Sequence, residues 1–343
     1  MKTFICGLSA LEFWQQLRCR EQPDLNMVHP VARDSSTLGL RQARATTPGP
    51  SLPNDSELRD ACRKMPYMLT APIDLLSTTK RSHGSTSMRT RHVWSGPLPR
   101  GSFVQISPGM HVASPEFLFL QLAQRISPQR LTLLGYELCG SYCMPVRGHH
   151  GTDGSTCLQA TSVTRLSEYL ARHELDGCHG INVARQVASN VVGFSNSPRE
   201  SAMVMLLCLP KKLGGYGLPR PRMNAVVYIP QHLRAIAGRA WFSIDALWRD
   251  RRFGVEYDGG VGHRGESNIA RDYSRANALL ALGYNVETIS NAQISDERSF
   301  DLFAHQVARS LGVRLRFEGS REAWRSKNRA LRGEVLSAHR WGN

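Results

Sequence analysis

The chain has 343 residues, and its 43 Lys and Arg residues against 28 Asp and Glu residues give a formal net charge of +15. This length is enough for a buried core and favours two domains, or one domain with additions. No stretch approaches the roughly 18 apolar residues of a membrane span, and Glu12 interrupts the N-terminal apolar run, which argues against a secretory signal. We therefore expect a cytoplasmic protein without a membrane partner. The basic excess favours polyanionic partners, nucleic acid first, with a solvated basic surface as the alternative.

The first 95 residues show few regular elements. Residues 9–18 have the apolar spacing of a short helix, whereas residues 22–55 are rich in Pro, Ser, Thr and Arg. Residues 79–100 contain basic side chains, including Arg89 and Arg91, and no acid. Two interpretations stay open for them, a basic loop that contacts DNA phosphate and a solvated surface strand with a turn. We expect residues 1–95 to form a short helix plus an irregular, partly disordered basic segment.

Residues 96–194 contain clearer signals. Residues 103–112 alternate as a strand, a turn and a strand, and Ser-Pro-Glu at 114–116 supplies a helix cap, a first-position proline and a first-turn acid. Further helices are expected over residues 130–142, 161–173 and 181–192. This pattern predicts a mainly helical module with a β-hairpin, which is either a winged helix that binds DNA or a packing domain.

The eight cysteines lack the paired spacing of a zinc ribbon and the density of a secreted mini-domain. Cys139 and Cys143, with His149 and His150 nearby, form a weak zinc pattern. Buried thiols without a ligand are the favoured interpretation, because free cysteine is a common small core residue. We expect the cysteines to be reduced.

The pattern of residues 241–260 predicts two strands joined by a charged turn, with Asp245 inside the first strand and Glu256 inside the second. Glu256 and Asp258 project to the same side of their strand, and hairpin pairing brings Asp245 beside them. Three gathered carboxylates repel one another unless a cation neutralises them, and hard oxygen ligands suit Mg²⁺ or Mn²⁺. In the alternative interpretation, these acids pair with turn arginines or cap backbone groups.

The flanking elements predict an α/β domain. Ser-Pro-Arg-Glu at 197–200 opens an apolar helix and places Glu200 in its first turn. A glycine-rich loop with His263 follows the hairpin, and a helix over residues 268–282 contains Asp272 and Arg275 and stops at a glycine. With strands before and after, the order is typical of one domain of about 120 residues.

These motifs in this order resemble the very-short-patch-repair-like branch of the PD-(D/E)xK nuclease superfamily over about residues 195–315. The motifs are Glu200, Asp245, Glu256-x-Asp258-Gly259, His263, Asp272-x-x-Arg275 and Gly283-Tyr284-Asn285-Val286. The resemblance implies a restriction-endonuclease-like domain, a mixed sheet flanked by helices, over residues 195–318. Residues 319–343 are rich in Arg and are expected to be a basic tail, either a helix on the DNA backbone or a frayed segment. Some relatives of this type are bacterial and resemble the AbiEi-type antitoxins, which place a winged helix ahead of a nuclease-like domain.

The resemblance also implies roles for the matching residues. Asp245, Glu256 and Asp258 would bind Mg²⁺ or Mn²⁺, with Glu200 as an outer ligand, and His263 would act as an acid or base. Arg275 would reach a phosphate, although an intrahelical pair with Asp272 is the alternative. The superfamily commonly has a lysine where this chain has Asp258, and the short-patch branch dispenses with it. The expected function is a Mg²⁺-dependent DNA endonuclease. The alternative is a non-catalytic, DNA-binding regulator of the antitoxin type with a toxin partner.

Overall fold

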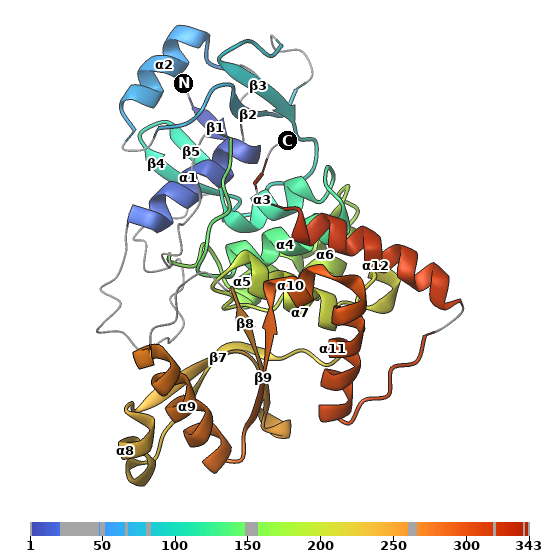
Figure 1. The fold of residues 1–343 in the computed structure, drawn as a ribbon. Helices are drawn as coiled ribbons and strands as arrows, with labels where there is room; N and C mark the ends of the chain where they lie inside the picture. The colour runs from blue at the N-terminus through green and yellow to red at the C-terminus, as the bar shows by residue number, and fades with distance from the viewer. Residues whose placement is uncertain are drawn as a thin grey trace. The chain divides into compact units, whose positions relative to one another are not determined.

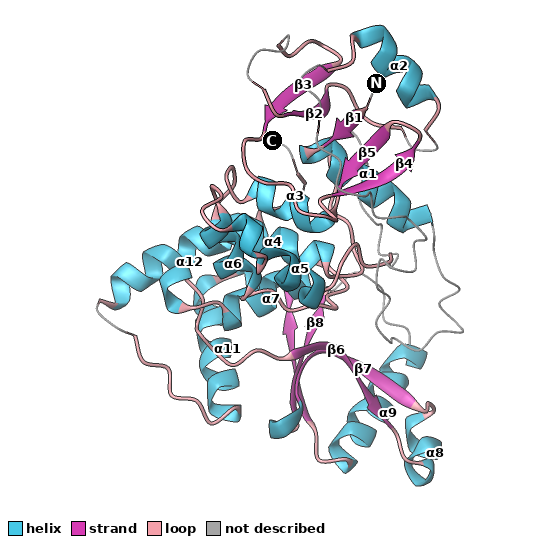
Figure 2. Cartoon of the chain, turned by 180° about the vertical axis from the view of Figure 1, so that it is seen from behind, coloured by secondary structure: helices cyan, strands magenta, loops and turns pink. Residues whose placement is uncertain are grey.

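A computed structural model gives the chain a mixed α/β fold with two mixed sheets flanked by helices (Figure 1, Figure 2). It divides into two compact units, Met1–Val191 with Ala338–Asn343, and Val192–Ser337. The structure describes residues 2–20, 48, 52–65, 68–79, 84–147, 157–259, 266–317, 320–338 and 340–341, without the side chains of Arg20 and of residues 266–271.

The first unit contains a five-stranded sheet in the order β3-β2-β1-β5-β4. The pairs β1–β5 and β2–β3 are parallel, and the pairs β1–β2 and β4–β5 are antiparallel. The strands are β1 Thr3–Ile5, β2 Ile73–Ser77, β3 Arg89–Val93, β4 Phe103–Ser107 and β5 Met110–Ala113. Every residue of β1 and β2 is buried, so these two strands lie in the core of the unit.

The helices of this unit pack on the sheet and on one another. They are α1 Gly7–Arg20, α2 Asp55–Arg63, α3 Pro115–Leu122, α4 Pro128–Leu138, α5 Val163–Leu170 and α6 Ile181–Ala188, with the short η2 at His173–Leu175. The predicted start of α3 is confirmed, because the Ser114 side chain accepts a hydrogen bond from the Phe117 N–H and Pro115 occupies the first turn. α3 is buried along its whole length against α1, α4, α5 and α6.

Within residues 1–95 the predicted short helix is confirmed as α1, but the prediction that the rest is irregular is wrong for the part that the structure describes. β1, β2 and β3 supply three strands of the first sheet, and β5 pairs with β1 across the predicted boundary at residue 95. The hairpin β4–β5 is therefore part of this sheet and not of a separate module with the helices. These strands are three to five residues long, and β1 and β2 have no exposed face, so no alternating pattern marks them. Most of the predicted irregular segment, residues 21–47 and 49–51, lies outside the described residues.

The second unit contains a four-stranded sheet in the order β6-β7-β8-β9, of which only β8–β9 is a parallel pair. The strands are β6 Arg222–Tyr228, β7 Trp241–Trp248, β8 Phe253–Asp258 and β9 Asn285–Ser290. The predicted hairpin is confirmed, since β7 and β8 are joined by the single turn η5 at Arg249–Arg251. Apolar side chains of β6, β7 and α9 form a core on one face of the sheet, among them Val227, Phe242, Ile244, Ala278 and Leu279.

The helices of the second unit lie on both sides of its sheet. α8 Arg234–Ala237 and α9 Glu266–Ala281 lie on one side and α11 Glu297–Ser310 on the other (Figure 1). α7 Pro198–Cys208 packs against β7 and β8, and α10 Asn291–Ser295 follows β9. The short helices η3 Lys211–Leu213 and η4 Gln231–Leu233 complete the unit.

Of the two interpretations of the C-terminal tail, the frayed segment is wrong for residues 321–336, which form helix α12 Arg321–Leu336 packed against α7 and η3. Trp324 Nε1 donates to the Gly215 carbonyl at 3.0 Å, and Asn328 Nδ2 donates to the Gly214 carbonyl at 2.7 Å. Arg332 is also buried and donates to the Ile294 carbonyl. The basic residues of α12 thus surround a buried stripe, and a charge count does not reveal it.

Candidate functional site

Asp245 lies in the inner strand β7, at the point where its pairing with β8 stops. The regular register runs from Trp248↔Phe253 to Ala246↔Val255 and goes no further. Beyond it, an Asp245 carboxylate oxygen accepts the backbone N–H of Tyr257 at 2.9 Å. A side chain therefore takes the place of a backbone carbonyl, and the acid is fixed at the end of the strand pair.

Pairing is also interrupted on the β6 side of Asp245. Met223 and Ala225 of β6 pair with β7, but Asn224 between them does not, and its φ of 46° is left-handed. Asparagine tolerates this conformation better than most residues, because its short polar side chain makes local hydrogen bonds. Here Asn224 Nδ2 donates to Glu200 Oε2 at 2.8 Å. Sequence reasoning missed Asn224, because nothing in a strand pattern marks a single left-handed residue.

Glu200 reaches this site from the first turn of α7. The predicted helix start is confirmed, since the Ser197 side chain accepts a hydrogen bond from the Glu200 N–H. Glu200 Oε2 also accepts the Asn196 N–H at 2.9 Å. The pKa of Glu200 is raised to about 7, first by burial and then by the negative charge of Asp245.

Glu256 of β8 forms an ion pair with Arg275 of α9, and Arg275 also donates to the Ser243 carbonyl at 2.6 Å. Burial raises the pKa of Glu256 to about 7; the charge of Asp245 also raises it, while Arg275 opposes the shift. Burial likewise raises the pKa of Asp245. We call Glu200, Asp245 and Glu256 the acidic site, since Asp245 interacts electrostatically with both glutamates.

Two further residues were predicted to belong to this site, Asp258 and His263. Asp258 is the half-buried last residue of β8 and is paired in register with Ser290. His263 lies outside the described residues. Among the side chains that the structure describes, the acids do not form a group of three with ligand atoms within 4.8 Å of one another. The one such group consists of Cys19, Cys143 and Cys157 in the first unit.

The predicted DNA-contacting arginines belong to different units. Arg275 is in the acidic site, whereas Arg89 and Arg91 lie in strand β3 of the first unit. Arg89 is only 7% exposed, and its Nε lies 3.8 Å from Asp55 Oδ1. The interpretation of residues 79–100 as a basic loop that presents Arg89 to phosphate is therefore wrong. Arg91 is half-buried in the same strand.

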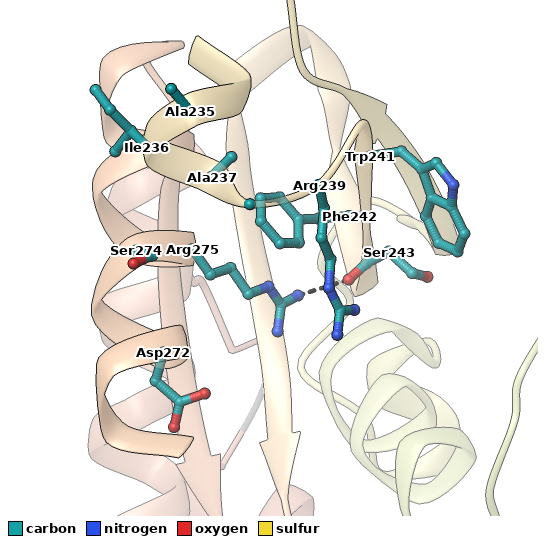
Figure 3. Close-up of a pocket in the computed structure, with 11 residues that line it drawn as sticks. Ala235, Ile236, Ala237, Arg239, Trp241, Phe242, Ser243, Asp272, Ser274 and Arg275 are labelled. Carbon is teal, nitrogen blue, oxygen red and sulfur yellow. Dashed lines mark hydrogen bonds between the residues drawn. The ribbon is translucent and has the colours of Figure 1, made fainter. Parts of the chain in front are cut away.

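A pocket of about 680 Å³ adjoins the acidic site through Arg275. Arg239 and Arg275 both extend guanidinium groups into it, and the dashed line in Figure 3 marks the bond from Arg275 to Ser243. Asp272 lies at its edge, and Trp241 and Phe242 supply aromatic walls. The Arg275 guanidinium lies 5.5 Å from the centre of the Phe242 ring. The pocket therefore offers two cations and two aromatic side chains beside carboxylates.

The raised pKa of Glu200 predicts how stability depends on pH in metal-free protein. Between the ordinary value of 4.5 and about 7, the folded state holds a proton that the unfolded state has released. The free energy of unfolding contributed by this group therefore falls as the pH rises through that window. We expect Glu200→Gln to be about 1–3 kcal/mol more stable than the wild type near pH 8 and nearly equal to it near pH 4.5.

Urea unfolding with EDTA at several pH values measures this difference. Glu322→Gln, at an exposed acid of α12, is the matched control and should not change the pH dependence. A Glu200→Gln variant that is less stable than the wild type near pH 8 would contradict the prediction.

Comparison with protein-family models, with curated proteins and with solved structures gave no match for this chain. No helix in the described ranges is long and apolar enough to cross a membrane.

Proposed function

We propose that this chain is a metal-dependent DNA endonuclease whose second unit is a restriction-endonuclease-like domain. The observation that carries the proposal is the arrangement around Asp245. An inner strand loses its regular pairing on both sides of this acid, and it interacts with the buried Glu200 and the half-buried Glu256. Burial raises the pKa values of all three acids, and the charge of Asp245 raises those of Glu200 and Glu256 further. Such an arrangement destabilises a fold, so its presence favours a function that uses these acids.

The donor chemistry of these residues fits Mg²⁺ or Mn²⁺. Asp245 and Glu256 would be the principal ligands, with Asp258 at the end of the same strand and Glu200 as an outer ligand. When bound, such an ion polarises the scissile phosphate and lowers the pKa of a water molecule. Tyr257 and Asn224 hold Asp245 and Glu200 in position through the hydrogen bonds described above. These bonds restrict the carboxylates before any ligand arrives.

Arg275 would bind the phosphate next to the acids. Its Nη2 is engaged by Glu256 and by the Ser243 carbonyl, and its Nε is buried without a hydrogen-bond partner among the described residues, so the contact to phosphate would come from the end of the guanidinium that extends into the pocket. A guanidinium is suited to phosphate because it presents several N–H groups in one plane. The exposed Trp241 at the pocket offers a surface on which a base of an opened strand stacks.

The pocket makes a prediction about DNA affinity. Arg239→Ala should weaken DNA binding severalfold at low salt and reduce the slope of log affinity against log salt by about 1, because one phosphate contact is lost. Arg309→Ala removes the same charge from exposed α11, on the other side of the sheet, and should have little effect. Electrophoretic mobility shifts at several salt concentrations measure both variants, and equal losses would contradict a role for the pocket.

A second candidate function is a non-catalytic DNA-binding regulator of the antitoxin type. Two observations favour it: Asp258 stands where the nuclease superfamily commonly has a lysine, and the described acids are not gathered within the distance of shared metal ligands. In this case the acids would be remnants of a nuclease-like scaffold. The protein would then bind DNA equally well with and without a divalent ion.

A cleavage assay separates the two candidates. Supercoiled, linear and mismatched DNA are incubated with the protein and Mg²⁺, Mn²⁺ or EDTA, and DNA binding is measured in EDTA with the same preparations. The nuclease proposal expects cutting that requires the ion. The regulator proposal expects mobility shifts in EDTA with no cutting under any of the conditions.

A further inference from the structure

Three cysteine side chains from distant parts of the first unit converge. Cys19 lies at the end of α1, and its Sγ is 3.9 Å from the Sγ of Cys143, which is 3.4 Å from the Sγ of Cys157. All three sulfurs lie within 4.8 Å of one another. Zn–S bonds of about 2.3 Å in a tetrahedron place neighbouring thiolates about 3.8 Å apart. The observed spacing therefore suits one zinc ion with little rearrangement.

A buried arginine organises the segments that present these sulfurs. Arg18 is fully buried and donates hydrogen bonds to backbone carbonyls on both sides of the cluster, those of Glu137, Gly140, Tyr142 and Leu158. The Cys157 N–H donates to the Ser141 carbonyl at 2.9 Å, which holds the two segments together. Burial of a guanidinium is costly unless its donors are satisfied and its charge is balanced.

The groups that can balance the charge of Arg18 are the cysteine cluster and Glu137. Arg18 interacts electrostatically with the sulfurs of Cys143, Cys157 and Cys19 and with the carboxyl group of Glu137, whose pKa burial raises to about 7, and Arg18 Nη1 has no hydrogen-bond partner among the described residues. Three thiolates and one Zn²⁺ carry a net charge of −1, which Arg18 offsets. A monovalent copper ion with the same ligands would leave a second negative charge in a buried place. Soft thiolate ligands also discriminate against Mg²⁺.

We propose that Cys19, Cys143 and Cys157 bind one Zn²⁺ ion. Cys143 and Cys157 are buried and Cys19 is partly exposed, so the ion enters from the Cys19 side and a solvent molecule completes its tetrahedron. Binding exchanges thiol protons for the metal, so affinity rises with pH. The ion ties the end of α1 to the segments between α4 and α5, and it stabilises the first unit independently of the acidic site.

Cobalt is the probe that tests this site. Full-length, reduced, metal-free protein is titrated anaerobically with Co²⁺, and we expect thiolate-to-cobalt charge-transfer absorption that saturates at one equivalent and disappears when Zn²⁺ is added. Loss of a partner outside the ligand set usually weakens metal binding about 10–100-fold. A variant that removes a ligand should therefore bind zinc more than about a hundredfold more weakly than the wild type. Three variants each remove one ligand: Cys19→Ser, Cys143→Ser and Cys157→Ser.

Cys62→Ser, at a partly exposed cysteine of α2, is the matched control and should bind Co²⁺ like the wild type. Cys19→Ser keeps the test decisive if the buried variants fail to fold. Zn²⁺ should also protect Cys19, but not Cys62, from alkylation. The proposal is overturned if reduced wild type shows no cobalt–thiolate band, if Cys19→Ser keeps it, or if the protein only forms a Cys143–Cys157 disulfide and binds no metal.

Discussion

Asp245→Asn should lower Mg²⁺-dependent DNA cleavage by about three orders of magnitude, equivalent to about 4 kcal/mol of transition-state stabilisation. Asparagine keeps an oxygen that accepts the Tyr257 N–H, so the end of β7 stays in place. The negative charge that a divalent ion requires is lost. Glu256→Gln should have a similar effect, although Arg275 then also loses its counter-ion. Initial cleavage rates with saturating Mg²⁺ measure both variants.

The control for this experiment lies in the same hairpin. Asp250 is an exposed acid of the turn η5, and Asp250→Asn removes the same charge without touching the acidic site. Binding of uncut DNA in EDTA should be nearly unchanged in all three variants, because that measurement does not depend on the metal. Cleavage that survives in Asp245→Asn, or that falls equally in Asp250→Asn, would rule out the acidic site as the source of the activity.

Arg18→Leu should lower the free energy of unfolding of the first unit by about 3–5 kcal/mol, because a buried set of hydrogen bonds from charged nitrogen atoms to backbone carbonyls is lost at once. Leucine fills part of the space but donates to none of the four carbonyls that Arg18 reaches. Each acceptor that is left buried without a donor adds to the cost. Urea unfolding followed by circular dichroism measures the change, with EDTA present so that zinc does not contribute.

Arg63→Leu is the matched control for Arg18→Leu. Arg63 ends helix α2 in the same unit, and its side chain is 78% exposed beside Asp60. Exposed ion pairs contribute little, so this variant should stay within about 0.5 kcal/mol of the wild type. Equal stability of Arg18→Leu and the wild type would mean that Arg18 does not organise the residues around the cysteines.

The two functional proposals concern separate units. The acidic site lies in the second unit and requires hard oxygen ligands, whereas the cysteine cluster lies in the first unit and requires soft sulfur ligands. A chelator that is selective for zinc should therefore destabilise the first unit without abolishing Mg²⁺-dependent cleavage. This difference keeps a failure of one proposal distinguishable from a failure of the other.

Local chemistry in the sequence was sufficient for several elements. Ser-Pro-Glu at 114–116 and Ser-Pro-Arg-Glu at 197–200 predict helix starts correctly, because a cap, a proline and a first-turn acid act within one turn. The β7–β8 hairpin was predictable for a similar reason, since two apolar runs flank a short charged turn. The acids inside those runs marked Asp245 and Glu256, because an acid in an apolar strand is unusual.

Tertiary contacts decided what local patterns do not encode. β1, β2 and β3 are only three to five residues long, and β1 and β2 are buried on both faces, so no alternating pattern marks them. β1 pairs with β2 and, across more than 100 residues of chain, with β5. Asn224 is left-handed, and its side-chain amide donates to Glu200 of another element and to the Phe194 carbonyl. Cys19 and Cys143 meet across a sequence separation of 124, which no spacing motif covers. Close packing of distant segments, rather than propensity or spacing, assembles both the acidic site and the cysteine cluster.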